Sequence, residues 1–297
     1  MGLAELACPC LEALVSLPGH EVVAVVTQPD KPKGRDLKLA PPPVKVTAQR
    51  LGIAVQQPSS MKDPAAIAAL AALRPDLIAV VAYGQILPKA VLELPPRGCI
   101  NVHTSLLPRW RGASPIQHAI LAGDPLTGVT TMYLNERMDA GDIILQRAEL
   151  IRPSDTSGAL HDRLAKLGAA LLVETVLLEN PLRQPQDETH ITYAKKLTKD
   201  DGRVDWTKPA VEIERMIRAF DPWPGAHTFV DEMMLKLWRA EVLPTTLAVP
   251  GTVLPGFVVA TGKGGLRILE LQPAGKRRMS TEEFLRGYKL GSGMLLR

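Results

Sequence analysis

The chain has 297 residues, of which 46% are hydrophobic and 22% charged, and its formal net charge is +4. This length predicts two domains, together large enough to bury a sizeable core. The longest apolar runs, such as residues 77–83, fall far short of the roughly 18 residues that a membrane helix needs, so we expect no membrane span.

The first half of the chain alternates helical and extended patterns. Helices are expected over 4–17, 42–51, 63–73 and 157–178, and between Ser114 and Gly123; strands are expected over 21–27, 53–57, 77–82, 98–103, 128–134 and 142–150. This alternation predicts an α/β fold with a doubly wound, mostly parallel sheet. Residues 28–38 combine two prolines, a glycine and four cations, which favours an exposed loop.

The second half has a different pattern. Residues 183–203 mix prolines and acids and are expected to form a surface linker, so we place a first domain at 1–182 and a second at 204–297. One helix is expected over 211–219, followed by five short strands over 227–230, 235–241, 251–254, 257–261 and 266–271. Five short strands separated by Gly and Pro turns predict a small β-barrel.

Charge is unevenly distributed between the two parts. Residues 1–189 carry a net charge of −1, and residues 190–297 carry +5. A basic domain beside a neutral one suggests an anionic partner such as nucleic acid.

The few cysteines and the start of the chain indicate a cytoplasmic protein. Met1 to Glu5 lacks the positive start and long apolar core of a signal peptide, and three cysteines fit a reducing compartment. Cys8-Pro9-Cys10 has no second ligand pair, so we expect buried thiols and no metal site.

The strand at 98–103 ends in two polar side chains. Asn101 and His103 are two residues apart and must project from one face of the strand. Ligands of open α/β sheets bind outside the carboxyl ends of the strands, where this pair falls. The alternative is that each group hydrogen-bonds a neighbouring backbone and has no chemical role.

The context of this pair carries a family resemblance. Residues 101–108 read Asn-Val-His-Thr-Ser-Leu-Leu-Pro, and about thirty residues later residues 137–142 read Arg-Met-Asp-Ala-Gly-Asp. These segments resemble the signature of the 10-formyltetrahydrofolate-dependent formyltransferases. The resemblance covers nearly the whole chain and is closest to members that formylate methionyl-tRNA. It implies a Rossmann-like formyltransferase domain followed by an OB-like β-barrel that binds tRNA.

The resemblance implies catalytic roles for Asn101, His103 and Asp139. An amide N–H of Asn101 can hold the oxyanion, and His103 can add a second donor or relay protons. Asp139 can orient His103, although Asp-Ala-Gly-Asp is also a good turn sequence and Asp142 is a competing carboxylate. Since no Cys or Ser lies in a nucleophile motif, direct transfer is expected.

The resemblance also implies two sets of binding residues. Folate would lie against Ser105, Leu106, Leu107, Pro108, Gln85, Ile86, Leu87 and Ala140. The tRNA would contact Lys31, Lys33, Arg35 and Lys38. The co-substrate would be 10-formyltetrahydrofolate, the partner an initiator methionyl-tRNA, and the protein a monomer.

Two other activities and one departure from the family stay open. The same catalytic segment fits relatives that formylate amino-sugar nucleotides, and a non-catalytic RNA-binding protein could use the same scaffold. The family opens with an apolar strand ahead of its Met-Gly turn, whereas this chain begins at Met1-Gly2. We therefore expect either a start site placed too late or a sheet with an exposed inner edge.

Overall fold

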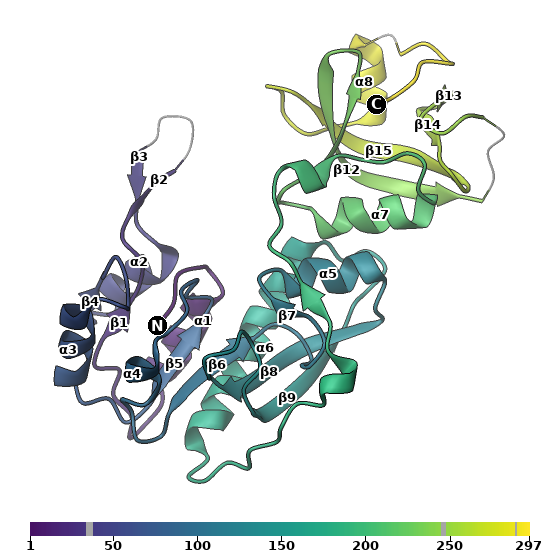
Figure 1. The fold of residues 1–297 in the computed structure, drawn as a ribbon. Helices are drawn as coiled ribbons and strands as arrows, with labels where there is room; N and C mark the ends of the chain where they lie inside the picture. The colour runs from purple at the N-terminus through teal and green to yellow at the C-terminus, as the bar shows by residue number, and fades with distance from the viewer. Residues whose placement is uncertain (34–37, 245–247, 289) are drawn as a thin grey trace. The chain divides into compact units, whose positions relative to one another are not determined.

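Two compact units make up the computed structural model, which describes residues 1–33, 38–244, 248–288 and 290–297 (Figure 1). The first unit comprises Met1–Pro115, Leu126–Leu150 and His161–Ala194, and the second comprises Ile116–Pro125, Ile151–Leu160 and Lys195–Arg297. The sequence predicts a linker over 183–203; the structure includes residues 183–194 of that stretch in the first unit.

The first unit contains a mixed four-stranded sheet in the order β5-β6-β8-β9. Its strands are β5 (Ile78–Val81), β6 (Cys99–His103), β8 (Leu126–Tyr133) and β9 (Ile143–Leu150). β5 and β6 are parallel, whereas β8 runs antiparallel to both β6 and β9. The predicted α/β class is confirmed, with the antiparallel pairs as an addition to the expected parallel strands.

Smaller strand pairs surround this sheet. They are β1 (Val25–Val26) with β4 (Val55–Gln56), β2 (Lys31–Lys33) with β3 (Lys38–Ala40), and β7 (Arg111–Gly112) with β10 (Tyr193–Ala194). The β2–β3 pair is an antiparallel hairpin, so the expectation of an exposed loop without regular structure over 28–38 is wrong for its described ends. Two three-residue strands that pair only with each other leave no periodic hydrophobic signal.

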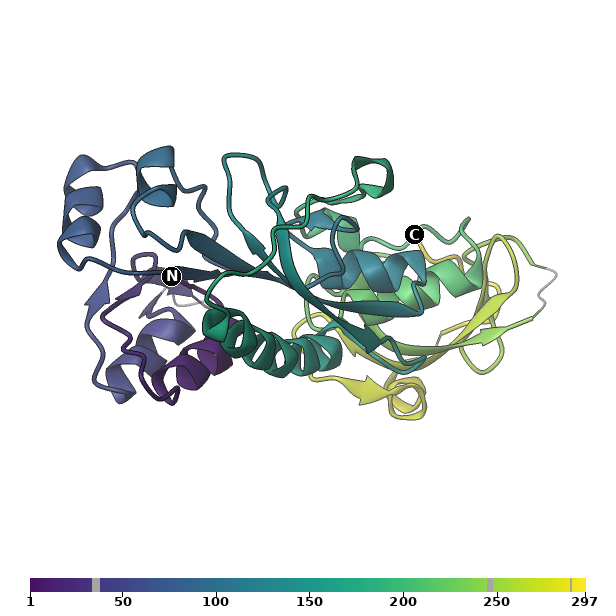
Figure 2. The ribbon, with the colours of Figure 1, turned by 90° about the horizontal axis from the view of Figure 1, so that it is seen from below.

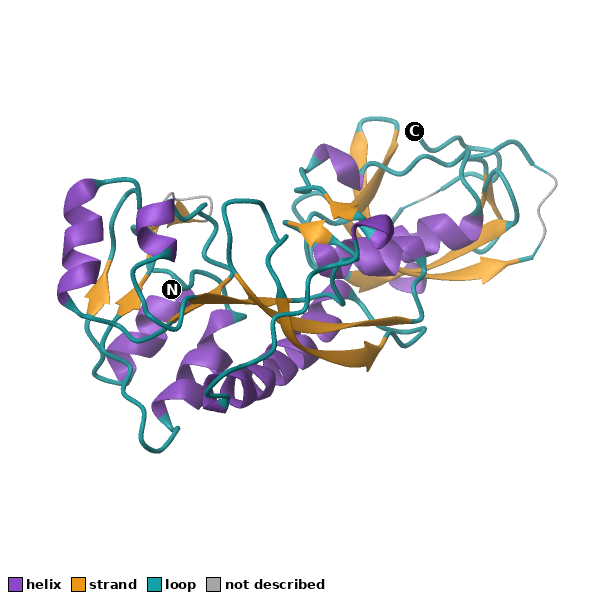
Figure 3. Cartoon of the chain, turned by 60° about the horizontal axis from the view of Figure 1, so that its bottom comes forward, coloured by secondary structure: helices purple, strands orange, loops and turns teal. Residues whose placement is uncertain are grey.

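Helices cover both faces of the first sheet. They are α1 (Ala7–Val15), α2 (Pro43–Arg50), α3 (Pro64–Ala72), α4 (Lys89–Leu92) and α6 (Ser157–Leu177), while α5 (Pro115–Ala122) follows β7. α1, α2 and α6 lie on one face, and α3 and α4 lie on the other, as the chain colours of Figure 2 identify them and Figure 3 shows from another angle. α6 runs along the sheet (Figure 2), where Gly168 faces Val102 and Val129 closely. The side chain of Asp63 caps α3 through the Ala65 N–H, as the Asp-Pro start predicts.

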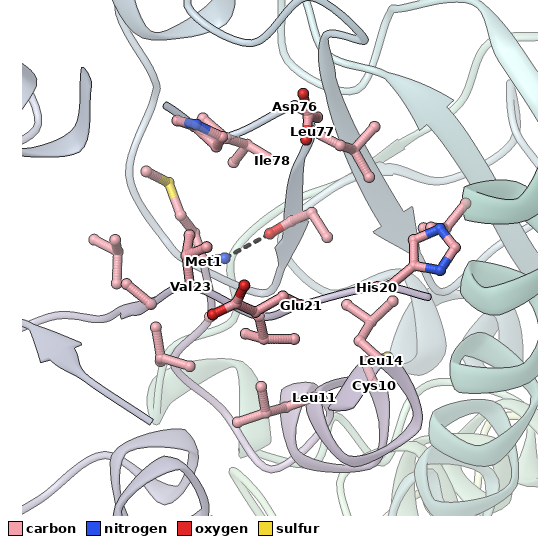
Figure 4. A pocket seen from close by; sticks show the side chains of 18 of the residues that line it. Met1, Cys10, Leu11, Leu14, His20, Glu21, Val23, Asp76, Leu77 and Ile78 are labelled. Atoms are coloured by element: carbon pink, nitrogen blue, oxygen red, sulfur yellow. Dashed lines mark hydrogen bonds between the residues drawn. The ribbon is translucent and has the colours of Figure 1, made fainter. Parts of the chain in front are cut away.

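The first unit has a gap between β1 and β5. β1 and β5 do not pair; instead Gly2 donates to the Val26 carbonyl, and the Met1 carbonyl accepts from Val81, at one end of the gap. The rest of the gap is a cavity of about 590 Å³, which we call the strand slot, bordered by residues 22–26 and 76–79. Figure 4 shows the Met1 amino group bonded inside it. Only two residues of the expected strand 21–27 are assigned to β1.

The second unit is rich in antiparallel strands, confirming the predicted class of the C-terminal part. Its sheet runs β11-β12-β15-β14-β13, and β16 pairs with β15. The elements are α7 (Ala210–Ala219), β11 (Ala226–Val230), β12 (Met233–Leu243), β13 (Val253–Leu254), β14 (Val258–Ala260), β15 (Gly265–Pro273), β16 (Met279–Ser280) and α8 (Thr281–Gly287). The apolar face of α7 joins the core of this unit through Ile213 and Ile217, and α8 joins it through Phe284. Short 3-10 turns occupy Glu188–His190 and Asp200–Gly202.

Candidate active site

Two polar side chains of β6 line one cleft in the first unit. β6 lies between β5 and β8 and is buried along its whole length, which leaves Asn101 only 9% exposed and His103 only 6% exposed. Because side chains alternate along a strand, both project from the same face. The cleft has a volume of about 480 Å³, and its other walls come from residues 82–87 and 134–139.

Backbone contacts fix the orientation of the His103 ring. Nε2 lies 2.9 Å from the Trp110 carbonyl oxygen, and since a carbonyl only accepts, Nε2 carries the proton and donates. Nδ1 then faces Asp139, whose Oδ1 lies 3.8 Å away. That separation exceeds a hydrogen bond but keeps the carboxylate close to any positive charge on the ring.

Asp139 is held at its carboxylate and at its backbone. Oδ2 accepts a hydrogen bond from the Gly112 N–H at 2.9 Å, while Oδ1 faces His103. The residue has a φ of 49°, which Asp tolerates better than most residues because its side chain bonds locally. Asp142 has no place among the residues that line the cleft within the described chain.

The Asn101 side chain presents its amide to the cleft. No hydrogen-bond partner for it is found in the part of the chain that the structure describes. Because the amide faces the cleft, its oxygen and N–H groups can bind a polar ligand there.

The residues 105–108 support the cleft from behind. The Ser105 hydroxyl donates to the Arg109 carbonyl at 2.7 Å, and the Thr130 hydroxyl donates to the Ser105 carbonyl at 2.7 Å. Leu107 is buried in a small cluster with Met132 and Ile143. Ser105, Leu106, Leu107 and Pro108 are not among the described residues that line the cleft, so direct contact with folate stays a prediction.

The remaining predicted folate residues fall into two groups. Gln85, Ile86 and Leu87 line the cleft, with Leu87 buried and Ile86 73% exposed. Gln85 is anchored because its Oε1 accepts from the Met61 N–H. Ala140 follows Asp139 but is not among the described lining residues.

Three of the four predicted tRNA residues lie on strands β2 and β3. Lys31 and Lys33 are on β2, and Lys38 begins β3 opposite Lys33. The Lys31 ammonium donates to Gln28 Oε1 at 2.7 Å, which ties it to the base of the hairpin. Arg35 lies outside the described residues.

Two buried thiols take no part in the cleft. Burial raises the pKa of both Cys10 and Cys99 to about 12, which keeps them protonated at neutral pH. Among the described residues, no cluster of three or more His, Cys, Asp or Glu side chains could hold a metal ion.

Comparisons with known proteins agree on one family. The family model described as formyl transferase matches residues 5–176, and that of the formyl transferase C-terminal domain matches residues 196–289. A methionyl-tRNA formyltransferase of Methylococcus capsulatus is 49% identical over 99% of this chain and 97% of its own length. One of Geobacillus thermodenitrificans is 50% identical over 97% of this chain and 92% of its own. The chain belongs to the methionyl-tRNA formyltransferase family.

Solved structures share the fold of this methionyl-tRNA formyltransferase family member. The sugar 3N-formyl transferase WlaRD, solved in the presence of dTDP and 5-N-formyl-THF, has a TM-score of 0.68 at 19% identity and covers 93% of this chain and 97% of its own. A methionyl-tRNA formyltransferase of Clostridium thermocellum has a TM-score of 0.51 at 18% identity and covers 64% of this chain and 81% of its own.

Within the described residues, no helix combines the length and apolarity needed to cross a membrane.

Two residues around the cleft escaped the sequence analysis. Gly112 supplies the N–H that binds Asp139, and its φ of 122° together with its approach to Ala194 leaves no room for a side chain. The glycine just before the Ser114-Pro115 helix start was the available signal. Gln186 binds the backbone of residues 137–142, which we call the acidic loop, yet it lies between the two ranges matched by the formyl transferase family models. No periodicity marks it, because it is one buried residue in an otherwise polar stretch.

Proposed function

We propose that this chain transfers the formyl group of 10-formyltetrahydrofolate to the amino group of methionine on initiator methionyl-tRNA. The supporting observation is that Asn101, His103 and Asp139 converge on one cleft in a chain whose whole-length relatives of this name are 45–50% identical to it. The reaction belongs to the cytoplasm, where tRNA is aminoacylated.

The lining of the cleft suits a partly polar co-substrate. Leu87, Leu134 and Met138 supply apolar surface, and Asn101 and Asp139 supply polar groups. A formylated tetrahydrofolate bound there would supply the electrophilic formyl carbon. The volume of about 480 Å³ falls in the usual range for small-molecule sites.

Each polar side chain has a task in this transfer. The Asn101 amide N–H can donate to the formyl oxygen, where negative charge develops, and removing such a donor typically costs about 2.7–4 kcal/mol in the transition state. His103 can accept the proton that the attacking amine loses and return one to the leaving nitrogen. The Asp139 carboxylate, facing Nδ1, would stabilise the ring while it is charged.

The tRNA would be bound by cations away from the cleft. We assign phosphate contacts to Lys31, Lys33 and Lys38, and base reading to Arg35, since the planar guanidinium can bind two base acceptors at once in a fixed geometry, whereas the lysine ammonium is a point charge. The surplus of +5 over residues 190–297 supports a second, sequence-independent contribution from the C-terminal part.

One assay separates this function from its two alternatives. The protein is mixed with 10-formyltetrahydrofolate and either methionyl-tRNA or an amino-sugar nucleotide, and formylated product is measured by mass spectrometry. Formylmethionyl-tRNA alone supports the proposal. Product only with the sugar nucleotide, or tRNA binding without any product, would favour the sugar enzyme or the RNA-binding protein respectively.

A further inference from the structure

The Gln186 side chain connects the loop that carries Asp139 with β7, whose Gly112 binds the Asp139 carboxylate. It is 9% exposed, and its Nε2 donates to the Asp139 carbonyl at 2.9 Å and to the Gly141 carbonyl at 2.8 Å. Its Oε1 accepts from Arg111 Nε at 2.9 Å. Nε2 also lies 3.8 Å from Met132 Sδ, so the amide N–H groups face the loop backbone and this sulfur, while the amide oxygen faces β7.

These bonds hold the loop backbone next to its exposed part. The four residues that precede Asp139 are all exposed: Asn135, Glu136, Arg137 and Met138. Asp139 itself has a φ of 49°, a conformation that costs an L residue free energy unless surrounding contacts hold it. Gln186 supplies that hold at the backbone.

The same amide sets the spacing between the loop and β7. Arg111, which Gln186 binds, directly precedes Gly112, whose N–H binds Asp139 Oδ2. Loop and strand are thus connected twice, once through Gln186 and once through the carboxylate itself. A shift of the loop relative to β7 would change the 3.8 Å separation between Asp139 and His103.

Backbone pairing on either side fixes the position of Gln186. Gln184 and Ile143 exchange two backbone hydrogen bonds, of 2.8 and 3.0 Å. Further along, β10 pairs with β7 in register, Tyr193 with Arg111 and Ala194 with Gly112. The amide is therefore presented from a segment anchored at both ends.

We propose that Gln186 is a positioning residue for formyl transfer, which holds the Asp139 carboxylate beside His103, where it stabilises the ring while the ring is charged. It is not among the described residues that line the cleft, so it acts through Asp139 and not on the reacting atoms. This inference rests on the proposed function.

The test substitutes the amide while keeping its shape. Gln186→Glu keeps the acceptor for Arg111 but replaces the two donors with an oxygen facing two carbonyls. We expect kcat for methionyl-tRNA formylation to fall at least tenfold, with KM for folate and tRNA within threefold. Gln186→Met, which removes donors and acceptor without adding charge, should lower kcat similarly. Gln184→Glu is the matched control, because the Gln184 side chain is exposed and, among the described residues, Gln184 is held through its backbone bonds to Ile143.

A double-mutant cycle distinguishes positioning from general structural support. In an Asp139→Asn background, Gln186→Glu should lower kcat less than twofold further, because its effect passes through the carboxylate. An equal loss in both backgrounds, or a near-normal kcat for both Gln186 variants, overturns the inference while leaving the proposed function intact. Failure of the unaltered protein to formylate methionyl-tRNA instead overturns the proposed function.

Discussion

At the scale of single residues, the chemistry of the cleft depends on which atoms of His103 and Asp139 already have hydrogen-bond partners. His103 Nε2–H donates to the Trp110 carbonyl, and the Gly112 N–H donates to Asp139 Oδ2, so His103 Nδ1 and Asp139 Oδ1 remain facing each other. Motif reading predicts these two residues and Asn101, since their types and spacing lie in the sequence. It does not predict Gln186, whose role depends on a fold that returns residues 184–194 to β7 and β9.

We predict that Asn101→Ala and His103→Ala each lower methionyl-tRNA formylation by two or more orders of magnitude. Both side chains act on developing charge or on proton transfer, so tRNA affinity should stay within a few-fold. Turnover is measured at saturating folate and tRNA, with tRNA binding measured separately. Near-normal turnover in either variant would remove that residue from the catalytic set.

Gly112→Ala should destabilise the first unit by at least about 3 kcal/mol, since a Cβ there would lie 2.4 Å from the Ala194 carbonyl oxygen. Gly52→Ala is the control: Gly52 also has a positive φ, of 71°, but nothing lies within 4 Å of an added Cβ. That control should lose only about 1–2 kcal/mol, the cost of a left-handed residue. Denaturant unfolding measures the loss of stability in both variants. Equal losses would contradict the prediction, because they would mean that the β7–β10 pair can move to admit the added Cβ without a cost in free energy.

At the scale of elements, the β2–β3 hairpin shows where composition misleads. Prolines and cations over 28–38 predict an irregular loop, and the sequence could not reveal strands whose only partners are each other. The base of the hairpin is fixed by Asp30, which accepts from Lys45 and Gln57. Bonding to Lys45 holds the pKa of the Asp30 carboxyl below its usual range, so these bonds persist at neutral pH.

We expect Arg35→Leu to slow formylation of the initiator tRNA much more than Lys38→Ala does. A base-reading arginine discriminates between tRNAs, so its loss should also shrink the preference over an elongator methionyl-tRNA. Lys38→Ala should weaken binding of both tRNAs and flatten the salt dependence. Rates on the two tRNAs at several salt concentrations make the comparison, and unchanged discrimination in Arg35→Leu would assign tRNA selection to the C-terminal part.

At the scale of the whole molecule, the alternation of helices and strands predicts both the α/β first unit and the strand-rich second unit. Leucines at helical spacing predict α6, and the Asp63-Pro64 start predicts α3, so both helices are recovered nearly to the residue. Short elements held by pairing alone, such as β7, β10 and β16, carry no such pattern. The strand slot follows from a comparison with the family and not from periodicity.

The strand slot predicts a pH-dependent stability for a chain with a free α-amino group at Met1. Burial lowers the pKa of that group to about 6 from 8.0. Between pH 6 and 8 the unfolded state therefore binds more protons than the folded state. The free energy of unfolding should fall by up to about 3 kcal/mol as the pH drops from 8 to 6. Denaturant unfolding at pH 8.5 and 5.5 measures the loss.

Extending the chain ahead of Met1 separates charge from burial. A five-residue apolar, β-branched segment should remove this pH dependence and also raise the unfolding temperature by filling the slot. A Gly-Ser segment of equal length should remove only the pH dependence. The histidines are the same in the unextended chain and the two extended chains, so their titration cancels when the chains are compared. Equal unfolding temperatures for the two extended chains would show that the slot does not take up a strand.

The return of residues 184–194 to the cleft has a consequence for the order in which the site can be completed during synthesis. β6, β7 and the acidic loop leave the ribosome first, yet the partner of β7 and the amide that binds the loop are encoded only after α6. The nascent chain therefore carries all three catalytic candidates before it can align them. A fragment that ends at residue 182 would permanently lack both β10 and Gln186, whereas one that continues through Ala194 would contain them.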